Sequence, residues 1–113
     1  MGDTVLSVSG LESGRGYLRI YPHCNRNGSG VTLLVMNIAP NTTFVLDGAG
    51  GAAASLLPRE EYVLTGEALT SRYISLNGAM LAVGADGATL PTMLPRKEAT
   101  AATFAIGPVV AFC

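Results

Sequence analysis

The chain has 113 residues, which is the size of one domain. Apolar residues make up 49% and charged residues only 13%, against a usual charged share of about 25%, which excludes an intrinsically disordered chain. The net charge of −1 removes the electrostatic argument for a nucleic acid or an anionic membrane as partner. With one histidine, no tryptophan and two cysteines, few groups are available to converge into an active site.

The first half of the sequence has almost no helical periodicity and predicts short strands between turns. Residues 4–9 partly alternate, and residues 17–24 alternate cleanly, with apolar side chains on one face and Tyr, Arg and His on the other. Residues 31–39 are apolar at nearly every position, which predicts a central strand covered on both faces. A short strand over residues 42–46 follows, and then a loop of small residues, 47–55.

The second half continues in the same way. Residues 60–64 predict a strand, and residues 72–76 and 79–83 predict two strands that flank Asn77-Gly78. Asn-Gly between strands predicts a hairpin, because both residues tolerate the positive φ of a type I′ turn.

The last part of the chain is divided by prolines. Residues 90–97 contain Pro91 and Pro95 and cannot form an inner strand. Residues 103–106 and 109–113 predict the final strands, with a kink at Gly107-Pro108. About eight short strands in one domain spanning residues 1–113 predict an all-β, antiparallel sandwich, or else a barrel.

No catalytic or metal site is expected. His23 and Cys24 are neighbours on one strand and point to opposite faces, so they cannot share a metal ion. Glu60 and Glu61 point apart for the same reason, and no G-x-S-x-G nucleophile turn occurs. We therefore assign no catalytic residue, no metal ligand and no cofactor.

Two pairs of residues can each be interpreted in two ways. Tyr17 and Tyr21 share one strand face with Arg19, which is either a packing face or a surface on which sugars stack. Cys24 and Cys113 are either buried thiols or one disulfide, and a disulfide requires an oxidising compartment.

Two N-glycosylation sequons begin at Asn27 and Asn41, both among turn-forming residues. They too would be used only outside the cytosol. No secretory signal is visible near the amino end, and no run approaches the roughly 18 apolar residues of a membrane span.

Several segments, in order, resemble the carboxy-terminal domain of heparanase-like proteins, which belong to glycoside hydrolase family 79. They are residues 5–8, 17–24, 31–38, 59–65, 75–78, 90–91 and 104–113. Residues 59–65 (REEYVLT) resemble the plant members in particular, and residues 104–113 match the family's closing Ala-x-Cys. Together these segments extend over nearly the whole chain.

The resemblance implies a β-sandwich that packs beside a (β/α)8 barrel. The family enzymes are retaining β-glucuronidases, acting on heparan sulfate or on other glucuronides such as plant arabinogalactan sugars. Their two catalytic glutamates lie in the barrel, and no glutamate of this sequence matches either motif. The chain is therefore expected to be a non-catalytic fragment that supports the barrel and is inactive alone.

The resemblance also implies further properties. It pairs Cys24 with Cys113 in a disulfide, which would stabilise the domain by about 4–5 kcal/mol in the chain-entropy model. It places the parent enzyme outside the cytosol, as a secreted, cell-wall, lysosomal or vacuolar glycoprotein. In the family a strand from near the amino end of the mature enzyme completes the sandwich, and this sequence lacks it.

Two rival functions remain. The first is a carbohydrate-binding module that binds a glucuronide-containing polysaccharide on Tyr17 and Tyr21. The second is an unrelated sandwich with a protein-interaction role. In the leading hypothesis, the absence of the barrel would leave an exposed apolar patch through which the chain could self-associate.

Overall fold

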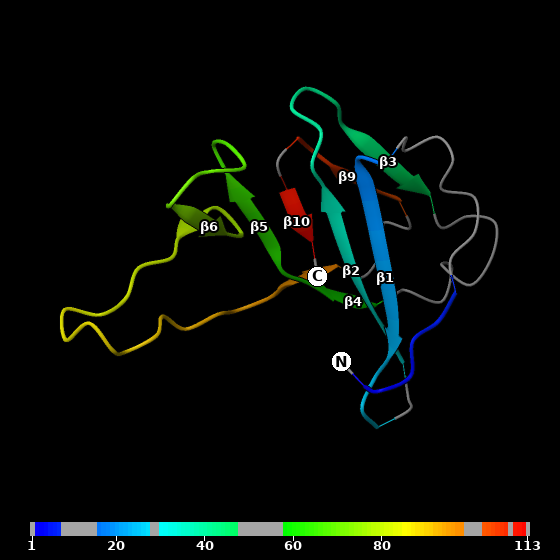
Figure 1. Cartoon of the computed structure of the whole chain (residues 1–113). Coiled ribbons are helices and arrows are strands. Elements are labelled where there is room, and N and C mark those ends of the chain that lie inside the picture. The colour runs from blue at the N-terminus through cyan, green and yellow to red at the C-terminus, as the bar shows by residue number, and fades with distance from the viewer. Residues whose placement is uncertain are drawn as a thin grey trace.

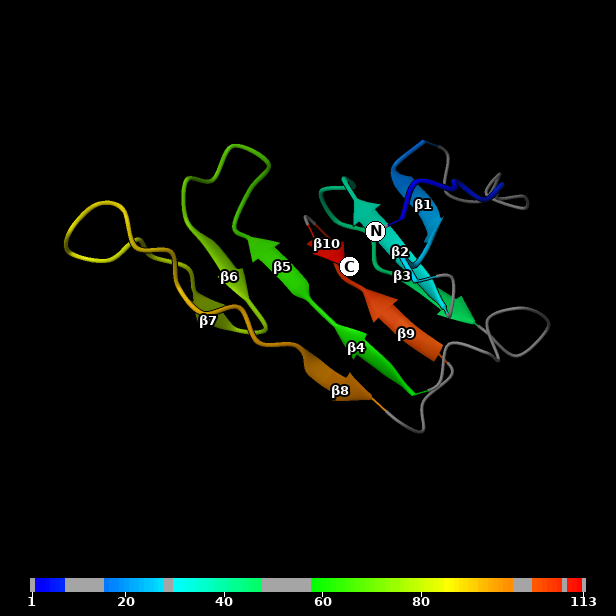
Figure 2. The same ribbon diagram turned by 90° about the horizontal axis from the view of Figure 1, so that it is seen from below.

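The computed structural model describes residues 2–7, 16–27, 30–47, 58–98, 103–108 and 110–112. All regular secondary structure within these residues is β-strand, as Figures 1 and 2 show. The ten strands are β1 (Leu18–Cys24), β2 (Val31–Asn37), β3 (Phe44–Asp47), β4 (Arg59–Glu61), β5 (Val63–Gly66), β6 (Ile74–Leu76), β7 (Ala79–Met80), β8 (Arg96–Glu98), β9 (Thr103–Ile106) and β10 (Val110–Phe112). No described segment is a helix long and apolar enough to cross a membrane.

Six strands form the main sheet, in the order β1-β2-β10-β5-β6-β7, and every neighbouring pair is antiparallel. The β1–β2 pair is the longest, running from Leu18 opposite Asn37 to Cys24 opposite Val31. β10 lies between β2 and β5, so the last strand along the chain joins the two halves of the sheet.

A second layer consists of two separate two-stranded sheets, β3–β9 and β4–β8. The core between the layers contains the buried side chains of Leu18, Val35 and Ile106. Partly buried apolar residues surround them: Ile20, Leu33, Phe44, Leu46 and Val63. The predicted all-β sandwich is therefore confirmed, and it is not closed into a barrel.

Two strands change layer through a bend. Tyr62 alone separates β4 from β5, which belong to different sheets, and β9 and β10 are likewise consecutive strands of different sheets. Figure 1 shows β5 continuing from β4 in a new direction. Such bends form the corners of orthogonally packed sandwiches, because one continuous segment then contributes to both sheets. The single strand predicted over residues 60–64 is for this reason two strands.

Several predicted strands differ from those observed. Residues 4–7 form only an isolated bridge, Val5 opposite His23, supported by a hydrogen bond from the Leu6 amide to the Pro22 carbonyl (3.0 Å). The hairpin at Asn77-Gly78 is confirmed, with φ of 48° and 86°. Its second strand, β7, has two residues instead of the predicted five.

The main sheet has an inner face toward the second layer and an outer face away from it. Val35 on the inner face is fully buried, whereas its neighbours Leu34 and Met36 on the outer face are only half-buried. The prediction of a central strand is confirmed, but the prediction that both faces are covered is wrong. Among the described segments, none forms a layer over the outer face of β2.

An extended segment, residues 81–95, which we call the arm, connects β7 to β8. Figures 1 and 2 show it projecting away from the sandwich. Its tip is a tight turn in which Asp86 accepts hydrogen bonds from the Ala88 amide (3.0 Å) and from the amide and hydroxyl of Thr89. These hydrogen bonds, above all the one from the Thr89 hydroxyl, lower the pKa of Asp86 from 3.8 to about 2.

Candidate functional site

Glu61 is the most deeply buried charge among the described residues, with 1% of its surface exposed. Its carboxylate accepts hydrogen bonds from Arg59 Nε (2.8 Å) and from Arg96 Nε (2.8 Å) and Nη2. Arg96 belongs to β8, so this cluster connects β8 to β4. Both carboxylate oxygens of Glu61 are occupied, and Glu60 points to solvent, as the alternation predicts. Glu61 therefore has a structural role.

Two asparagines account for further polar contacts. The buried Asn37 amide donates to the carbonyls of Thr42, Ile106 and Gly107, at 2.7, 3.1 and 2.8 Å, and its Oδ1 accepts from the Ala39 amide. It thereby holds the end of β2 against the corner after β9.

Asn77 links the hairpin to its neighbours. Its Oδ1 accepts from the Val63 amide (3.0 Å), and its Nδ2 donates to the carbonyls of Glu61 (3.3 Å) and Leu94 (3.0 Å). Within the described residues, every buried side-chain nitrogen or oxygen has a hydrogen-bond partner. The buried polar groups of the described residues therefore stabilise the fold through hydrogen bonds.

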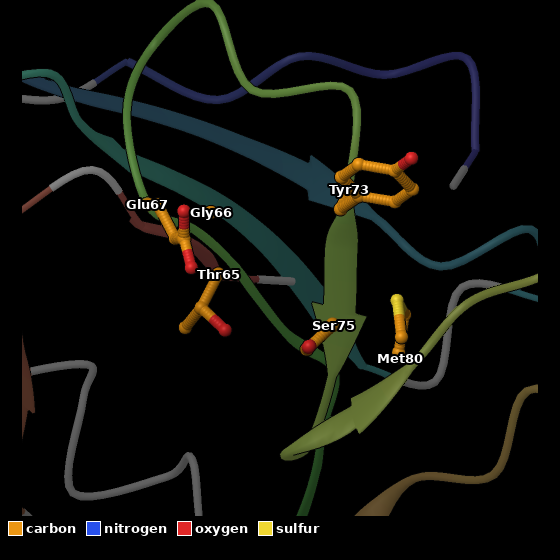
Figure 3. A pocket seen from close by; sticks show the side chains of 6 residues that line it. All are labelled: Thr65, Gly66, Glu67, Tyr73, Ser75 and Met80. Atoms are coloured by element: carbon orange, nitrogen blue, oxygen red, sulfur yellow. The ribbon is translucent and has the colours of Figure 1, made fainter.

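A hollow, shown in Figure 3, has a volume of about 560 Å³ and lies on the inner face of the main sheet. Thr65, Ser75 and Met80 form its floor, because they are directly opposite one another across β5, β6 and β7. Glu67 and Tyr73 also line it. Among the described residues that line it, Glu67 is the one carboxylate, and glycoside hydrolysis needs two. The hollow is thus suited to binding and not to that reaction.

A second hollow, of about 270 Å³, lies on the outer face of the main sheet. We call it the outer groove, and its apolar lining comes from Met36 and Ile38 at the end of β2, Leu64 on β5, and Leu69 and Ile74 near β6. None of the described residues that line it is charged. Its chemistry suits an apolar partner.

The tyrosines predicted from the sequence lie on the outer face. Tyr17 is 49% exposed and Tyr21 is 44% exposed. The exposed Arg19 is between them on β1. His23 is half-buried, and its Nδ1 is 3.3 Å from the carbonyl oxygen of Gly2. No three His, Cys, Asp or Glu side chains in the described part of the chain are grouped so that they could hold a metal ion.

The other predicted site residues are only partly described. Cys24 is half-buried at the end of β1, and its expected partner Cys113 is outside the described residues, so the disulfide stays a prediction. Asn27 and Asn41 are both exposed, in the connections after β1 and β2. Thr43, the last residue of the second sequon, is exposed too.

The sequence did not reveal the two hollows or the Glu61 cluster. The sequence signals for these sites were weak. Thr65 and Ser75, which line the first hollow, are merely polar positions within strands, and Arg96 is 35 residues from Glu61 along the chain. Pairings over such distances depend on the topology, which a strand pattern alone leaves open.

No protein-family model matches the chain. It is 31% identical to baicalin-beta-D-glucuronidase of Scutellaria baicalensis, over 96% of the chain and 20% of that protein. It is 30% identical to heparanase-like protein 1 of Arabidopsis thaliana, over 84% of the chain and 23% of that protein. Half of the chain also matches heparanase-like protein 2 of Arabidopsis thaliana, at 36% identity. The chain, which spans about a fifth of the length of the first two relatives, therefore belongs to the heparanase-like family.

Proposed function

We propose that the chain is the non-catalytic carboxy-terminal β-sandwich of a heparanase-like glycoside hydrolase. Its role is to pack against a catalytic (β/α)8 barrel of the same parent protein and to support it. The parent activity is the hydrolysis of β-glucuronide O-glycosyl bonds, and the name of the Scutellaria relative, a β-D-glucuronidase, supports this assignment.

One observation carries the proposal: exposed apolar side chains are concentrated in one part of the chain. Eight of the fifteen large hydrophobic residues that are exposed in the described part of the structure belong to residues 69–94, and we call them the apolar flank. They are Leu69, Tyr73, Ile74, Met80, Val83, Leu90, Met93 and Leu94. Such a concentration of exposed apolar side chains marks an interface, because leaving them in water is unfavourable.

The outer groove extends this surface onto the main sheet. Leu69 and Ile74 belong both to the apolar flank and to the lining of the groove. A single partner that covers the flank would therefore reach Met36 and Leu64 on the half-covered outer face. A catalytic domain of the same polypeptide fits this surface, since the relatives are about five times longer than this chain.

The described carboxylates support a non-catalytic role. A retaining glycosidase holds two carboxyl groups about 5 to 5.5 Å apart. Three of the described carboxylates are not arranged as such a pair: Glu61 binds two arginines, Asp86 is held in the turn of the arm, and Glu67 is the one acid among the described residues that line its hollow.

An extracellular or vacuolar location is part of the same proposal. The exposure of Asn41 and Thr43 supports a glycan at this sequon. A Cys24–Cys113 disulfide would form in the same compartments. Peptide mapping by mass spectrometry under non-reducing conditions tests the linkage, and recovery of both cysteines as free thiols from secreted protein would contradict it.

Two measurements test the function. The purified chain should not hydrolyse a chromogenic β-glucuronide above the buffer rate, and turnover would contradict the non-catalytic assignment. In the full-length parent, the double substitution Leu90→Ser and Leu94→Ser should lower the thermal stability of the enzyme. The matched control is Val45→Ser, which changes an equally exposed residue on β3. Equal effects of the two variants would overturn the proposed interface.

A further inference from the structure

We infer that the outer face of β1 is a binding site for a carboxylated oligosaccharide, formed by Tyr17, Arg19 and Tyr21. Sugar rings would stack on the two tyrosines, and a carboxylate would bind the guanidinium between them. The site and the apolar flank lie toward opposite edges of the main sheet, β1 and β7, although Arg19 is directly opposite Met36, which lines the outer groove. The existence of the site does not depend on the proposed docking to a barrel.

The backbone places the three side chains in a row. Tyr17 immediately precedes β1, and its carbonyl accepts a hydrogen bond from the Ile38 amide (2.9 Å), so it continues the β1–β2 ladder. Alternate residues of a strand share one face, and each residue advances by about 3.3 Å, so the two tyrosines are about 13 Å apart with Arg19 midway. That separation lets the two rings contact different sugars of one oligosaccharide.

None of the three side chains is buried in the core. Roughly half of each tyrosine surface is exposed, and Arg19 is exposed as well. Among the described residues, no hydrogen bond or ion pair engages the Arg19 guanidinium, whereas Arg59 and Arg96 both bind Glu61. Arg19 is therefore available to an external anion.

The chemistry of the row selects the class of ligand. Aromatic faces attract the C–H groups of sugar rings, and a guanidinium matches a carboxylate in a bidentate pair. A single arginine is too little positive charge for a nucleic acid, which needs several phosphate contacts.

The surroundings of the row also favour an acidic ligand. The next side chain on this face of β1 is that of His23, which is half-buried. Asp3 belongs to the segment that pairs with the far end of β1, where the Gly2 amide donates to the Cys24 carbonyl. The hollow of Figure 3, by contrast, contains Glu67, which would repel an acidic sugar.

The test is a titration of the 113-residue chain followed by two-dimensional amide NMR. The probes are a hexasaccharide of alternating glucuronic acid and N-acetylglucosamine, and the same compound with its carboxyl groups reduced to alcohols. We expect shifts centred on residues 17–21 and tighter binding of the acidic probe. Arg19→Gln should weaken acidic binding about tenfold, the effect of losing one charge-assisted hydrogen-bonded pair, and remove the preference between probes.

Further variants separate this site from other surfaces. Tyr21→Ala should weaken the binding of both probes. Tyr73→Ala, which changes an exposed tyrosine of the Figure 3 hollow, should leave the binding of both unchanged. The Leu90→Ser, Leu94→Ser variant should bind like the unchanged chain, whatever it does to a parent enzyme. The amide spectrum of each variant shows whether it is folded. No shifts at millimolar probe, equal affinity for both probes, or a loss with Tyr73→Ala would overturn the inference.

Discussion

The two ends of the main sheet are built differently. At one end β1 and β2 pair over seven residues and pack on β3 and β9, with Val35 and Ile106 fully buried between the layers. At the other end β6 and β7 pair over only two residues, and the side chains of Leu90 and Leu94 in the arm that follows are exposed to solvent. Both ends expose some apolar side chains, but the fully buried core residues Val35 and Ile106 belong to the first end, and the most exposed leucines, Leu90 and Leu94, follow the second. The difference indicates that the first end stabilises the domain and the second is shaped for a partner.

The largest expected effect contrasts one side chain from each end. Ile106→Ala should lower the free energy of unfolding by about 2–5 kcal/mol, because it removes buried methyl and methylene groups and leaves a cavity. Leu90→Ala should change it by less than about 0.5 kcal/mol, since this leucine is 71% exposed. Urea unfolding of the isolated chain measures both. A comparable loss from Leu90→Ala would show that the arm packs within the domain.

The connection between β4 and β8, which follows the arm, is tested at Glu61. Glu61→Ala should lower the free energy of unfolding by about 3 kcal/mol, because it leaves Arg59 and Arg96 without their shared carboxylate. This loss is at the lower end of the usual range because the Arg96 side chain is 62% exposed and water screens part of its charge. Glu60→Ala, one position away and exposed, is the control and should be nearly neutral. A neutral Glu61→Ala would mean that β8 is not held to β4 by this cluster.

A smaller effect is expected in the hairpin that leads into the arm. Gly78 has a φ of 86°, which residues with a side chain rarely adopt. Gly78→Ala should therefore lower the free energy of unfolding by about 1 kcal/mol through backbone strain. Gly66→Ala provides a comparison at a glycine without positive φ, where a Cβ would meet only atoms at 3.5 Å or beyond. Thermal unfolding of both variants distinguishes strain from crowding. A larger loss at Gly66 would contradict this explanation.

The smallest effect concerns the pH dependence of the arm. Because the folded pKa of Asp86 is lowered from 3.8 to about 2, its hydrogen bonds stabilise the turn fully above pH 4. This stabilisation is lost as the pH falls through about 2. Carbon-detected NMR titration of the Asp86 carboxyl group measures the pKa directly. Thr89→Val removes the strongest hydrogen bond and should raise the pKa toward 3.8, and an unchanged value would contradict the assigned cause.

The sequence predicted the elements well where the strand pattern is local. The alternation over residues 17–24 predicted β1, the pattern over residues 103–106 predicted β9, and Asn77-Gly78 predicted its hairpin. The pattern did not predict the bend at Tyr62, because a strand that changes layer keeps its apolar alternation on both sides of the bend. It also assigned residues 79–83 to a strand, since exposed apolar residues of an interface have the same composition as a buried strand.

The candidate sites were less accessible to the sequence. Tyr17, Arg19 and Tyr21 were found because they belong to one strand, where the spacing fixes the face. The outer groove joins residues from β2, β5 and the segment before β6, and no local pattern brings Met36 and Ile74 together. The half-covered outer face of β2 was wrongly expected to be covered, because apolar residues on a strand do not specify what lies over them.

The central position of β10 affects the order in which this domain can assemble. The β1–β2 hairpin and the β5–β6–β7 meander can each form from neighbouring residues, but the described sheet joins them through residues 110–112. Long-range pairings of this kind form late, because their loop-closure entropy is lost before the contacts compensate for it. Cleavage after Ile106 would therefore leave two short sheets with open edges, and the integrity of a few carboxy-terminal residues controls whether the domain exists as one unit.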